Sequence, residues 1–520
     1  MPWAAGAGYP GLQEAAELVA RGAQYRGGRA PPLDGHRRAV RTSTGHHPRL
    51  IGVDAKMTDT EIQTEQTATV AATSAAATSA AYRNDRAHVV HSWSAQASLD
   101  PVVVAGGSGS RFWDETGRTW LDFSSQLVNV NLGHQHPKLI AAIQAQAERL
   151  CTLAPYHANE ATAEAARLIA QAAPGDLDKV FFTSGGAEAV ENAVRIARHH
   201  TGRIKVLSAY RSYHGATAGA ISLTGDPRRW GAEPGMPGTV KFWGPYAYRS
   251  AFYSDSEAQE CERALAHLAD VLRVEGPHTV AAVVLESVVG GNGVLVPPDG
   301  YLRGVRELCD RHGIVMVADE VMAGFGRCGE WFAIDRWGVV PDLITFAKGV
   351  NCGYVPLGGV IISERIAQIF AHRVFPGGLT YSGHPLACAA AVACLNVYRE
   401  EGIIERVRRL GEELVRPELE ALKSRHPSVG EVRGLGMFWA LELVRDPVSR
   451  EPLVPYNAAG ADNRPMAEFA AACKDKGLWP FVHFNRVHIA PPLNIGEADL
   501  RTGLAIIDDA LHVADRYLAQ

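Results

Sequence analysis

The chain has 520 residues, of which 47% are hydrophobic and 21% are charged, and its formal net charge is −5. This composition excludes a disordered chain, a collagen-like repeat and a small disulfide scaffold, and the length allows two or more domains. The 51 basic and 56 acidic residues nearly cancel, which argues against a nucleic-acid partner bound through phosphate neutralisation. The arithmetic therefore indicates a soluble globular protein, and we expect an enzyme.

The first 84 residues differ in composition from the rest. Residues 1–56 are rich in Gly, Pro, Arg and His, and residues 57–81 are a low-complexity Thr/Ala/Ser stretch. We predict that 1–84 form a disordered extension, and we hypothesise that translation begins at Met57. The G-x-G-x-x-G pattern at 6–11 follows no strand, so chance explains it better than a dinucleotide-binding oxidoreductase does.

Several absences bear on location. The apolar runs are short and interrupted by acids, and no secretory signal opens the chain, so we expect no membrane association. The eight cysteines are scattered without a Cys-x-x-Cys pair, which is typical of reduced thiols in the cytoplasm. Because no paired Cys/His cluster or His-Glu-x-x-His motif occurs, we expect no metal site.

The middle of the chain predicts an α/β fold. A hairpin is expected to turn at Thr116-Gly117, and residues 137–150 have helical spacing. From about 160 to 365, helical stretches alternate with short β-branched runs, which favours a large domain with a mostly parallel sheet. After residue 386, a long helical stretch, two strand-like segments and a final helix indicate a smaller α+β domain. The predicted boundaries are 85–150 for the N-terminal segment of the small domain, 151–385 for the large domain and 386–520 for the C-terminal part of the small domain.

Polar side chains follow five of the predicted strands. In an open parallel sheet, ligands bind outside the carboxyl ends of the strands. Each of these residues alone is better explained as a strand end leaving the core, but five at one edge of one sheet suggest a site. They are Ser184, His214, Glu286, Asp319 and Lys348.

A glycine turn follows the first of these strands. Gly185, Gly186 and Ala187 precede a helix that starts at about Glu188. The free backbone N–H groups and positive dipole of such a helix start bind anions, typically phosphate. An ordinary loop glycine pair is the alternative.

Lys348 and Asp319 have complementary chemistry. A lysine in apolar surroundings can act as an amine nucleophile toward an aldehyde, although a solvated lysine is the alternative. Asp319 ends a buried run and needs a partner, which a cationic ring nitrogen, a helix cap or an internal salt bridge would supply. A phosphate cradle, this lysine and this acid are the parts that pyridoxal 5'-phosphate requires, and Tyr213 offers a ring to stack on the pyridine.

With these motifs in place, residues 85–515 resemble the class III pyridoxal-phosphate-dependent aminotransferases of fold type I. The most specific piece runs from Asp319 through Arg327 and Pro341-Asp342 to Lys348-Gly349. Tyr213-His214-Gly215 and the segment 380–385 also match. Two positions depart from the family pattern: Ala187 stands where a hydroxyl residue is commoner, and Ser287 replaces the usual proline after Glu286.

The resemblance implies a role for each residue. Lys348 would bind the cofactor as a Schiff base and move the substrate proton, while Asp319 would keep the ring nitrogen protonated. Val321 would pack beneath the ring, and the partner subunit's Thr380 would reach the phosphate. The implied catalytic residues are Lys348 and Asp319, and the implied cofactor-binding residues are Gly185, Gly186, Ala187, Tyr213, His214, Glu286, Asp319, Val321, Lys348 and Thr380.

Substrate recognition is expected from both ends of the chain. Trp93 and Leu127 are predicted to line the pocket mouth. Arg486 and Arg433 are candidates for a carboxylate or sulfonate, with an internal salt bridge as the alternative for each. The stretches 91–93, 124–128 and 481–493, which contain Trp93, Leu127 and Arg486, are similar to the ω-amino-acid:pyruvate subgroup, including taurine–pyruvate enzymes.

The resemblance therefore implies ping-pong transfer of an amino group from a taurine, β-alanine or GABA type donor to a 2-oxo acid, with pyruvate expected. A site shared between subunits implies a homodimer or a tetramer of dimers. A racemase, aminomutase or decarboxylase of the same fold would use the same lysine and aspartate and stays open. The intact Lys348 and Asp319 argue against a non-catalytic binding protein.

Overall fold

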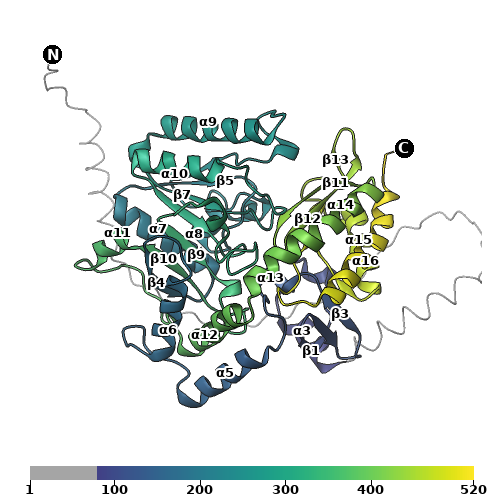
Figure 1. The fold of residues 1–520 in the computed structure, drawn as a ribbon, viewed down its shortest axis with the longest axis horizontal. Helices are drawn as coiled ribbons and strands as arrows, with labels where there is room; N and C mark the ends of the chain where they lie inside the picture. Colours follow the sequence, from purple (N-terminus) through teal and green to yellow (C-terminus); the bar gives the residue numbers. More distant parts are fainter. Residues whose placement is uncertain (1–78, 520) are drawn as a thin grey trace, which may run out of the picture. The chain divides into compact units, whose positions relative to one another are not determined.

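The computed structural model describes residues 79–519 (Figure 1). The expectations for the N-terminal extension up to residue 78, including a start at Met57, lie outside the described residues. The first described helix, α3 (Ala80–His88), begins four residues before the predicted end of that extension, and Ser79 caps it by accepting from the Tyr82 N–H at 3.0 Å.

A seven-stranded sheet forms the centre of the fold, in the order β4-β10-β9-β8-β7-β5-β6. Strands β9, β8, β7, β5 and β6 pair in parallel, whereas β10 is antiparallel to both of its neighbours, β4 and β9. The expected α/β fold with a mostly parallel sheet is confirmed. The strands are β4 (Leu177–Thr183), β5 (Lys205–Ala209), β6 (Thr239–Phe242), β7 (Val280–Glu286), β8 (Val315–Asp319), β9 (Leu343–Phe346) and β10 (Gly358–Ser363).

Both faces of this sheet are buried, which explains why its strands are almost uniformly apolar. Side chains alternate between the faces because the strand period is two residues. On β8, Val315 and Val317 pack in the cluster that contains α7, while Met316 and Ala318 pack in the cluster that contains α9 and α10. The helices around the sheet are α6 (Glu160–Ala170), α7 (Gly186–Thr201), α8 (Ala218–Leu223), α9 (Glu257–Glu275), α10 (Tyr301–His312), α11 (Glu364–Ala367) and α12 (Pro385–Glu400).

Two smaller sheets bring distant parts of the chain together. In one, the N-terminal strands β1, β2 and β3 are joined by β14, which pairs in parallel with β3; β2 and β3 form the expected hairpin. The other has the order β11-β12-β16-β15, with β13 paired to β12. The strands are β1 (Val104–Ser108), β2 (Arg111–Asp114), β3 (Thr119–Asp122), β11 (Val429–Leu435), β12 (Phe438–Asp446), β13 (Glu451–Pro452), β14 (Leu478–Trp479), β15 (Phe481–His483) and β16 (Arg486–Ile489).

The helices of these N- and C-terminal segments complete the fold (Figure 1). Helix α13 continues through a π-helical turn, Gly411–Val415, into α14. The remaining helices are α4 (Ser125–Val128), α5 (Pro137–Arg149), α13 (Ile403–Leu410), α14 (Arg416–Arg425), α15 (Arg464–Asp475) and α16 (Glu497–Asp515). The domain boundaries at residues 150 and 385 stay a prediction. Within residues 79–519, each helix is too short or too polar to span a bilayer.

Candidate active site

Lys348 follows the last residues of β9 at the carboxyl edge of the central sheet. Its backbone has φ +46°, a left-handed conformation that is strained for a residue with a side chain. Backbone strain of this kind is common at functional sites. Burial lowers the pKa of the Lys348 amine to about 8, against an opposing effect of the nearby Glu286 and Asp319 charges. Among the described residues, the amine forms no hydrogen bond or ion pair, so it is available as a nucleophile.

Asp319 is the last residue of β8, the strand next to β9. Its Oδ2 lies 2.7 Å from Nδ1 of His214, and its Oδ1 accepts from the Val321 N–H at 3.1 Å. Both Asp319 and His214 are buried, 3% exposed each. A buried carboxylate needs such donors, and the histidine therefore orients Asp319 at the strand end.

Glu286 ends β7 directly beside Asp319 in the parallel register. Its two carboxylate oxygens accept from the Tyr213 N–H at 2.9 Å and the Gly290 N–H at 2.8 Å. Burial raises the pKa of Glu286 to about 7; His214 and the two backbone donors oppose this shift, and the charge of Asp319 adds to it. Glu286 thus fixes the loop that carries Tyr213.

The glycine turn before α7 contacts two other parts of the site. A Cβ built on Gly186 would lie 2.8 Å from Cγ1 of Val321, and one on Gly215 would lie 2.6 Å from Cβ of Ala187. Only glycine permits such approaches. A Cβ on Gly185 would meet no atom within 4 Å, so there is open space beside the helix start. The helix therefore begins next to Val321 and the Tyr213-His214-Gly215 loop.

Tyr213 lies within a group of aromatic and cationic side chains. Trp93 contacts it edge to face, with ring centroids 6.3 Å apart. The Arg228 guanidinium carbon lies 3.6 Å from the Tyr213 ring centroid and 5.8 Å from that of Trp93. The sequence reasoning missed Arg228. Its only local signal is the helix start Asp226-Pro227, in which Asp226 caps the turn that holds the arginine.

Arg433 and Arg486 both approach one buried glutamate. Arg433 pairs with Glu431 and, at 2.8 Å, with Glu442, and its Nε donates to the Gly293 carbonyl. Arg486 Nε lies 3.3 Å from Glu442, which is 0% exposed. For Arg433 the structure shows the internal salt bridge, which was the alternative to substrate binding. Arg486 leaves its terminal nitrogens free of ion pairs within residues 79–519, and its substrate role stays a prediction.

Two sequence candidates lie at the surface. Leu127 is 52% exposed, in the kinked helix α4. Thr380 is exposed in the loop before α12, and its side chain makes no hydrogen bond to another described residue. Since Thr380 was expected to act on a partner's site, its role stays a prediction.

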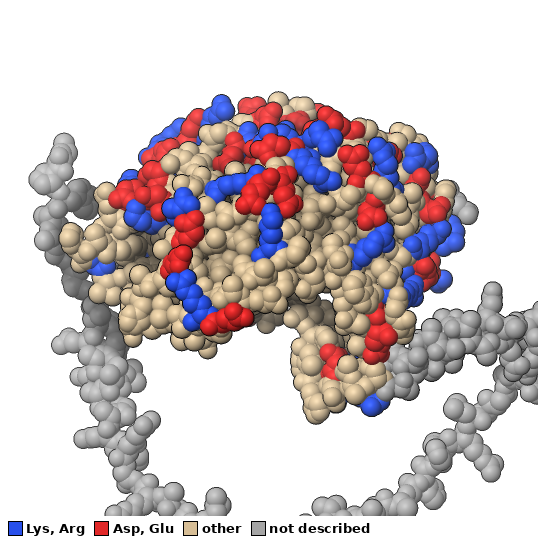
Figure 2. Space-filling model, turned by 60° about the horizontal axis from the view of Figure 1, so that its bottom comes forward, with Lys and Arg blue, Asp and Glu red and all other residues tan. Residues whose placement is uncertain are grey.

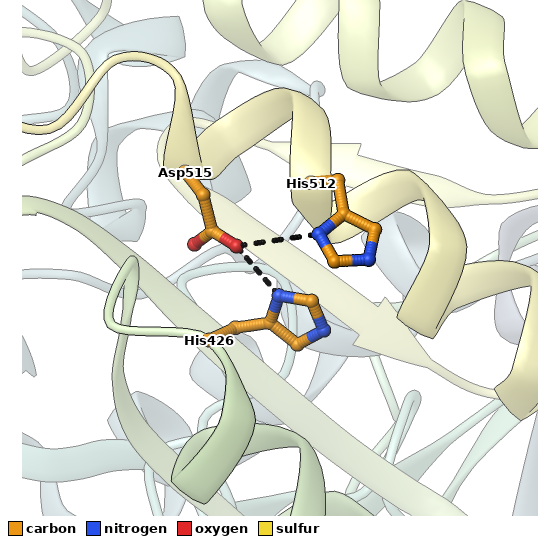
Figure 3. A group of neighbouring side chains, drawn as sticks. All are labelled: His426, His512 and Asp515. Carbon is orange, nitrogen blue, oxygen red and sulfur yellow. Dashed lines mark hydrogen bonds and ion pairs between the residues drawn. The ribbon is translucent and has the colours of Figure 1, made fainter.

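A separate group lies near the C-terminus, where His426, His512 and Asp515 approach one another (Figure 3). These residue types can bind a metal ion. However, both ring nitrogens of His426 lie at hydrogen-bonding distance from carboxylates, 2.6 Å from Asp515 and 2.7 Å from Asp508. Both ring nitrogens of His426 are therefore already occupied by carboxylate partners.

The described residues fit pyridoxal 5'-phosphate. The unpartnered amine of Lys348 suits an aldehyde, the buried and oriented Asp319 suits a ring nitrogen, and the open space at Gly185 lies at a helix start that suits a phosphate. These groups converge at the carboxyl edge of a mostly parallel sheet, as expected for ligand sites. The fold and the site define a pyridoxal-phosphate-dependent enzyme of fold type I.

Comparison with known proteins defines the family. The model of the aminotransferase class-III family matches residues 93–511, and the chain belongs to this family. It is therefore an aminotransferase that uses pyridoxal 5'-phosphate, and the racemase, aminomutase and decarboxylase alternatives are set aside.

The chain is similar to relatives over most of their length. It is 36% identical to the 4-aminobutyrate aminotransferase GabT of Escherichia coli over 80% of this chain and 95% of that one. It is 37% identical to the 5-aminovalerate aminotransferase DavT of Pseudomonas aeruginosa over 79% and 93%. Among solved structures, the taurine:2-oxoglutarate aminotransferase of Bifidobacterium kashiwanohense, in complex with PLP and glutamate, has 42% identity and a TM-score of 0.81, covering 84% and 98%.

Proposed function

We propose that this aminotransferase takes its amino group from an ω-amino acid, of the taurine, β-alanine or GABA type, and passes it to a 2-oxo acid. The observation that carries the proposal is the guanidinium of Arg228 over the ring of Tyr213, 3.6 Å from its centroid. The names of the relatives, which act on 4-aminobutyrate, 5-aminovalerate and taurine, support the same donor class.

Arg228 is positioned to bind the acidic end of such a donor. Its Nε lies 3.1 Å and 3.0 Å from the two oxygens of Asp226, a buried carboxylate that also accepts from the Arg228 N–H. Nη2 also bonds to Asp226, while Nη1 has no hydrogen-bond acceptor within residues 79–519. A guanidinium held in place on one side can bind a carboxylate or sulfonate through its free edge.

The other residues supply the proton chemistry. Bound pyridoxal phosphate provides the electron sink that makes the C–H bond next to the amino group acidic. Lys348, with a pKa of about 8, can accept and return a proton at Nζ near neutral pH. Asp319, oriented by His214, presents a carboxylate that stabilises a proton on a ring nitrogen. Pyruvate, the acceptor expected from the sequence, stays a prediction.

A donor panel tests the proposal. Taurine, β-alanine and 4-aminobutyrate should each give an amino acid product from a 2-oxo acid, and Lys348→Ala should abolish turnover. Arg228→Met should lower kcat/KM for these donors by about 30-fold or more, because a charge pair is lost, and should leave an uncharged amine donor nearly unaffected. Equal loss with acidic and uncharged donors would contradict the role of Arg228, and no amino transfer from any acidic donor would contradict the proposed function.

We also propose a homodimer, or a tetramer of dimers, in the cytoplasm. Several large apolar residues are exposed, among them Val90 (84%), Trp93 (61%), Tyr156 (82%), Val374 (90%) and Tyr381 (63%). Figure 2 shows a face with a broad area of uncharged residues below a rim on which acidic and basic residues alternate. The exposed apolar residues favour a partner. The free thiols of all eight cysteines favour a reducing compartment. Light scattering would test the assembly, and a mass equal to one chain would contradict it.

A further inference from the structure

Two buried cysteines lie close together beside the backbone that carries Lys348. The Sγ atoms of Cys352 and Cys394 are 3.5 Å apart, and the two residues are 1% and 0% exposed. Cys352 comes four residues after Lys348, in the loop that follows β9, and Cys394 lies within helix α12. Among the eight cysteines, all of which lie within residues 79–519, no other pair forms a hydrogen bond between thiols.

The loop between Lys348 and Cys352 is held by contacts with α12. The Cys394 thiol donates to the Gly349 carbonyl at 3.6 Å, and the Tyr398 hydroxyl donates to the same oxygen at 2.9 Å. Both Lys348 and Cys352 have a left-handed backbone, with φ +46° and +59°, which is strained for residues with a side chain. The position of Lys348 therefore depends on contacts in which the thiol pair takes part.

The two thiols differ in how readily they ionise. Burial would raise the pKa of the Cys352 thiol, but hydrogen bonds from Cys394 and from the Leu132 N–H, 3.3 Å from its Sγ, hold that pKa below its usual value. Burial raises the pKa of the Cys394 thiol well above its usual value, and its hydrogen bond to Cys352 raises it further. Because the thiolate is the form that reacts with oxidants, Cys352 is suited to react first and Cys394 to resolve the product.

Joining the two sulfurs requires only a small movement. A disulfide has an S–S length of about 2.05 Å, so the two Sγ atoms must approach by about 1.5 Å from their present 3.5 Å. Cys394 is held in α12, a helix of 16 residues that packs on α5 and α6. Cys352 lies in a loop, and the next residue, Gly353, is exposed. The loop is therefore the part that can move, and a small oxidant can approach Cys352 from the surface at Gly353.

We propose that Cys352 and Cys394 form a redox-modification site, in which hydrogen peroxide converts the two thiols to a disulfide and reversibly inactivates the enzyme. The Cys352 thiolate attacks one peroxide oxygen, which gives a sulfenic acid and releases hydroxide. The Cys394 thiol then attacks the Cys352 sulfur, which forms the S–S bond and releases the sulfenic oxygen as water. The hydroxide takes up the proton that Cys352 had lost. The two sulfurs together lose two electrons, and the peroxide is reduced to two molecules of water. A dithiol returns the pair to free thiols by exchange.

The disulfide displaces Lys348 in two ways. It removes the Cys394 proton that is donated to the Gly349 carbonyl, and it draws the loop after Lys348 toward α12. A displacement of about 1 Å at a reacting group can lower a rate by about 100-fold. The inference does not depend on which amino donor the enzyme uses, because every donor reacts through Lys348.

The first test looks for the bond itself in the full-length holoenzyme. Wild type, Cys352→Ser, Cys394→Ser and a control, Cys151→Ser, are treated with hydrogen peroxide, blocked with N-ethylmaleimide and digested with trypsin without reductant. Wild type and Cys151→Ser, in which an exposed thiol is removed, should give two linked peptides about 2 Da lighter than the sum of the reduced peptides. Trypsin leaves Cys388 and Cys394 in one peptide, so absence of the link in Cys394→Ser assigns the bond to Cys394.

The second test measures the effect on the enzyme, with one readout that does not depend on turnover. Absorbance follows uptake of pyridoxal phosphate by the apoenzyme, and an amino-transfer assay follows the holoenzyme. Peroxide should slow both by about 10-fold or more in the wild type and in Cys151→Ser, and dithiothreitol should restore both. Cys352→Ser should keep most of its own untreated rates. In peroxide-treated Cys394→Ser, the sulfenic acid reagent dimedone should label Cys352.

Four results would contradict the proposal. Absence of the link between Cys352 and Cys394 at a peroxide dose that oxidises the exposed Cys151 would overturn the modification site. A link that forms without slowing cofactor uptake or amino transfer would overturn its effect on Lys348. Equal inactivation of Cys352→Ser and the wild type would place the damage elsewhere, and absence of dimedone label on Cys352 in Cys394→Ser would refute the assigned order of reaction.

Discussion

The imidazole Nδ1 of His214 lies 2.7 Å from Oδ2 of Asp319, and both side chains are buried. The two residues come from different parts of the chain, the loop after β5 and the end of β8. An ionised Asp319 can only accept, so the proton in this contact belongs to the histidine. The hydrogen bond therefore orients the carboxylate at the end of β8.

Loss of this hydrogen bond should weaken cofactor binding. A hydrogen bond to a charged group contributes about 1.5–3 kcal/mol, so His214→Ala should raise the Kd for pyridoxal phosphate by roughly 10- to 100-fold. Asp319→Asn, which cannot stabilise a protonated ring nitrogen, should lower kcat by roughly 10²- to 10⁴-fold. Absorbance titration of the apoenzyme gives the Kd. His199→Ala, at an exposed position of α7, is the control, and equal Kd values for the two histidine variants would contradict the positioning role.

Cofactor capture should depend on pH through Lys348. Burial lowers the pKa of the Lys348 amine to about 8, although the charges of Glu286 and Asp319 raise it. Because the neutral amine is the nucleophile, the rate of cofactor uptake by the apoenzyme should rise with pH and level off above about 8. Glu286→Gln removes a negative charge that raises the pKa, so the midpoint should move to lower pH, while Glu286→Asp keeps the charge. Stopped-flow absorbance from roughly pH 6 to 10 measures this midpoint; a shift to higher pH in Glu286→Gln would refute the electrostatic account.

The position of the main catalytic and cofactor-binding residues could be predicted from the sequence because each of them follows a strand. The apolar runs that end at Glu286, Asp319 and close to Lys348 are buried on both faces, so they read clearly as strands of a parallel sheet. Parallel strands place their carboxyl ends at one edge, which brings Glu286 beside Asp319. The position of β10, antiparallel between β4 and β9, has no counterpart in the local pattern.

The substrate side of the site was harder to predict because its residues meet only through tertiary packing. Arg228 approaches Tyr213 from a short helical turn after α8, and nothing in the local sequence distinguishes it from Arg229. The opposite case is Arg433, whose partners Glu431 and Glu442 lie on β11 and the neighbouring strand β12. Only the pairing of those strands reveals that the arginine is already neutralised.

A side chain at Gly186 should disturb the cofactor cradle. The Cβ of Gly186→Ala would lie 2.8 Å from Cγ1 of Val321, closer than packed carbons approach, so either the helix start or Val321 must move. Such overpacking costs about 1–3 kcal/mol, and Gly186→Ala should show weaker cofactor binding and a lower melting temperature. Adding Val321→Ala should restore part of the stability.

Gly231→Ala is the matched control for this prediction. A Cβ at Gly231 meets no atom within 4 Å, so that variant should bind the cofactor like the wild type. Unchanged cofactor affinity in Gly186→Ala would show that the contact between the helix start and Val321 is not tight in solution.

The buried imidazole of His426 should hold the C-terminal helix α16 in place. Its two nitrogens contact Asp508 and Asp515 of α16, and His426 itself follows the last residue of α14. Figure 3 shows the contact with Asp515. Removing one partner of a buried pair costs about 3–5 kcal/mol, and because these aspartates are 35% and 21% exposed, we expect about 2 kcal/mol from His426→Gln. Urea unfolding measures the free energy of unfolding.

His512→Ala is the control, since His512 is 74% exposed and lies 3.9 Å from Asp515. This variant should lower the free energy of unfolding by less than about 0.5 kcal/mol. If a chelator lowers the melting temperature and Zn²⁺ restores it, then His426, His512 and Asp515 bind a metal ion, and the hydrogen bonds of His426 alone do not explain the stability.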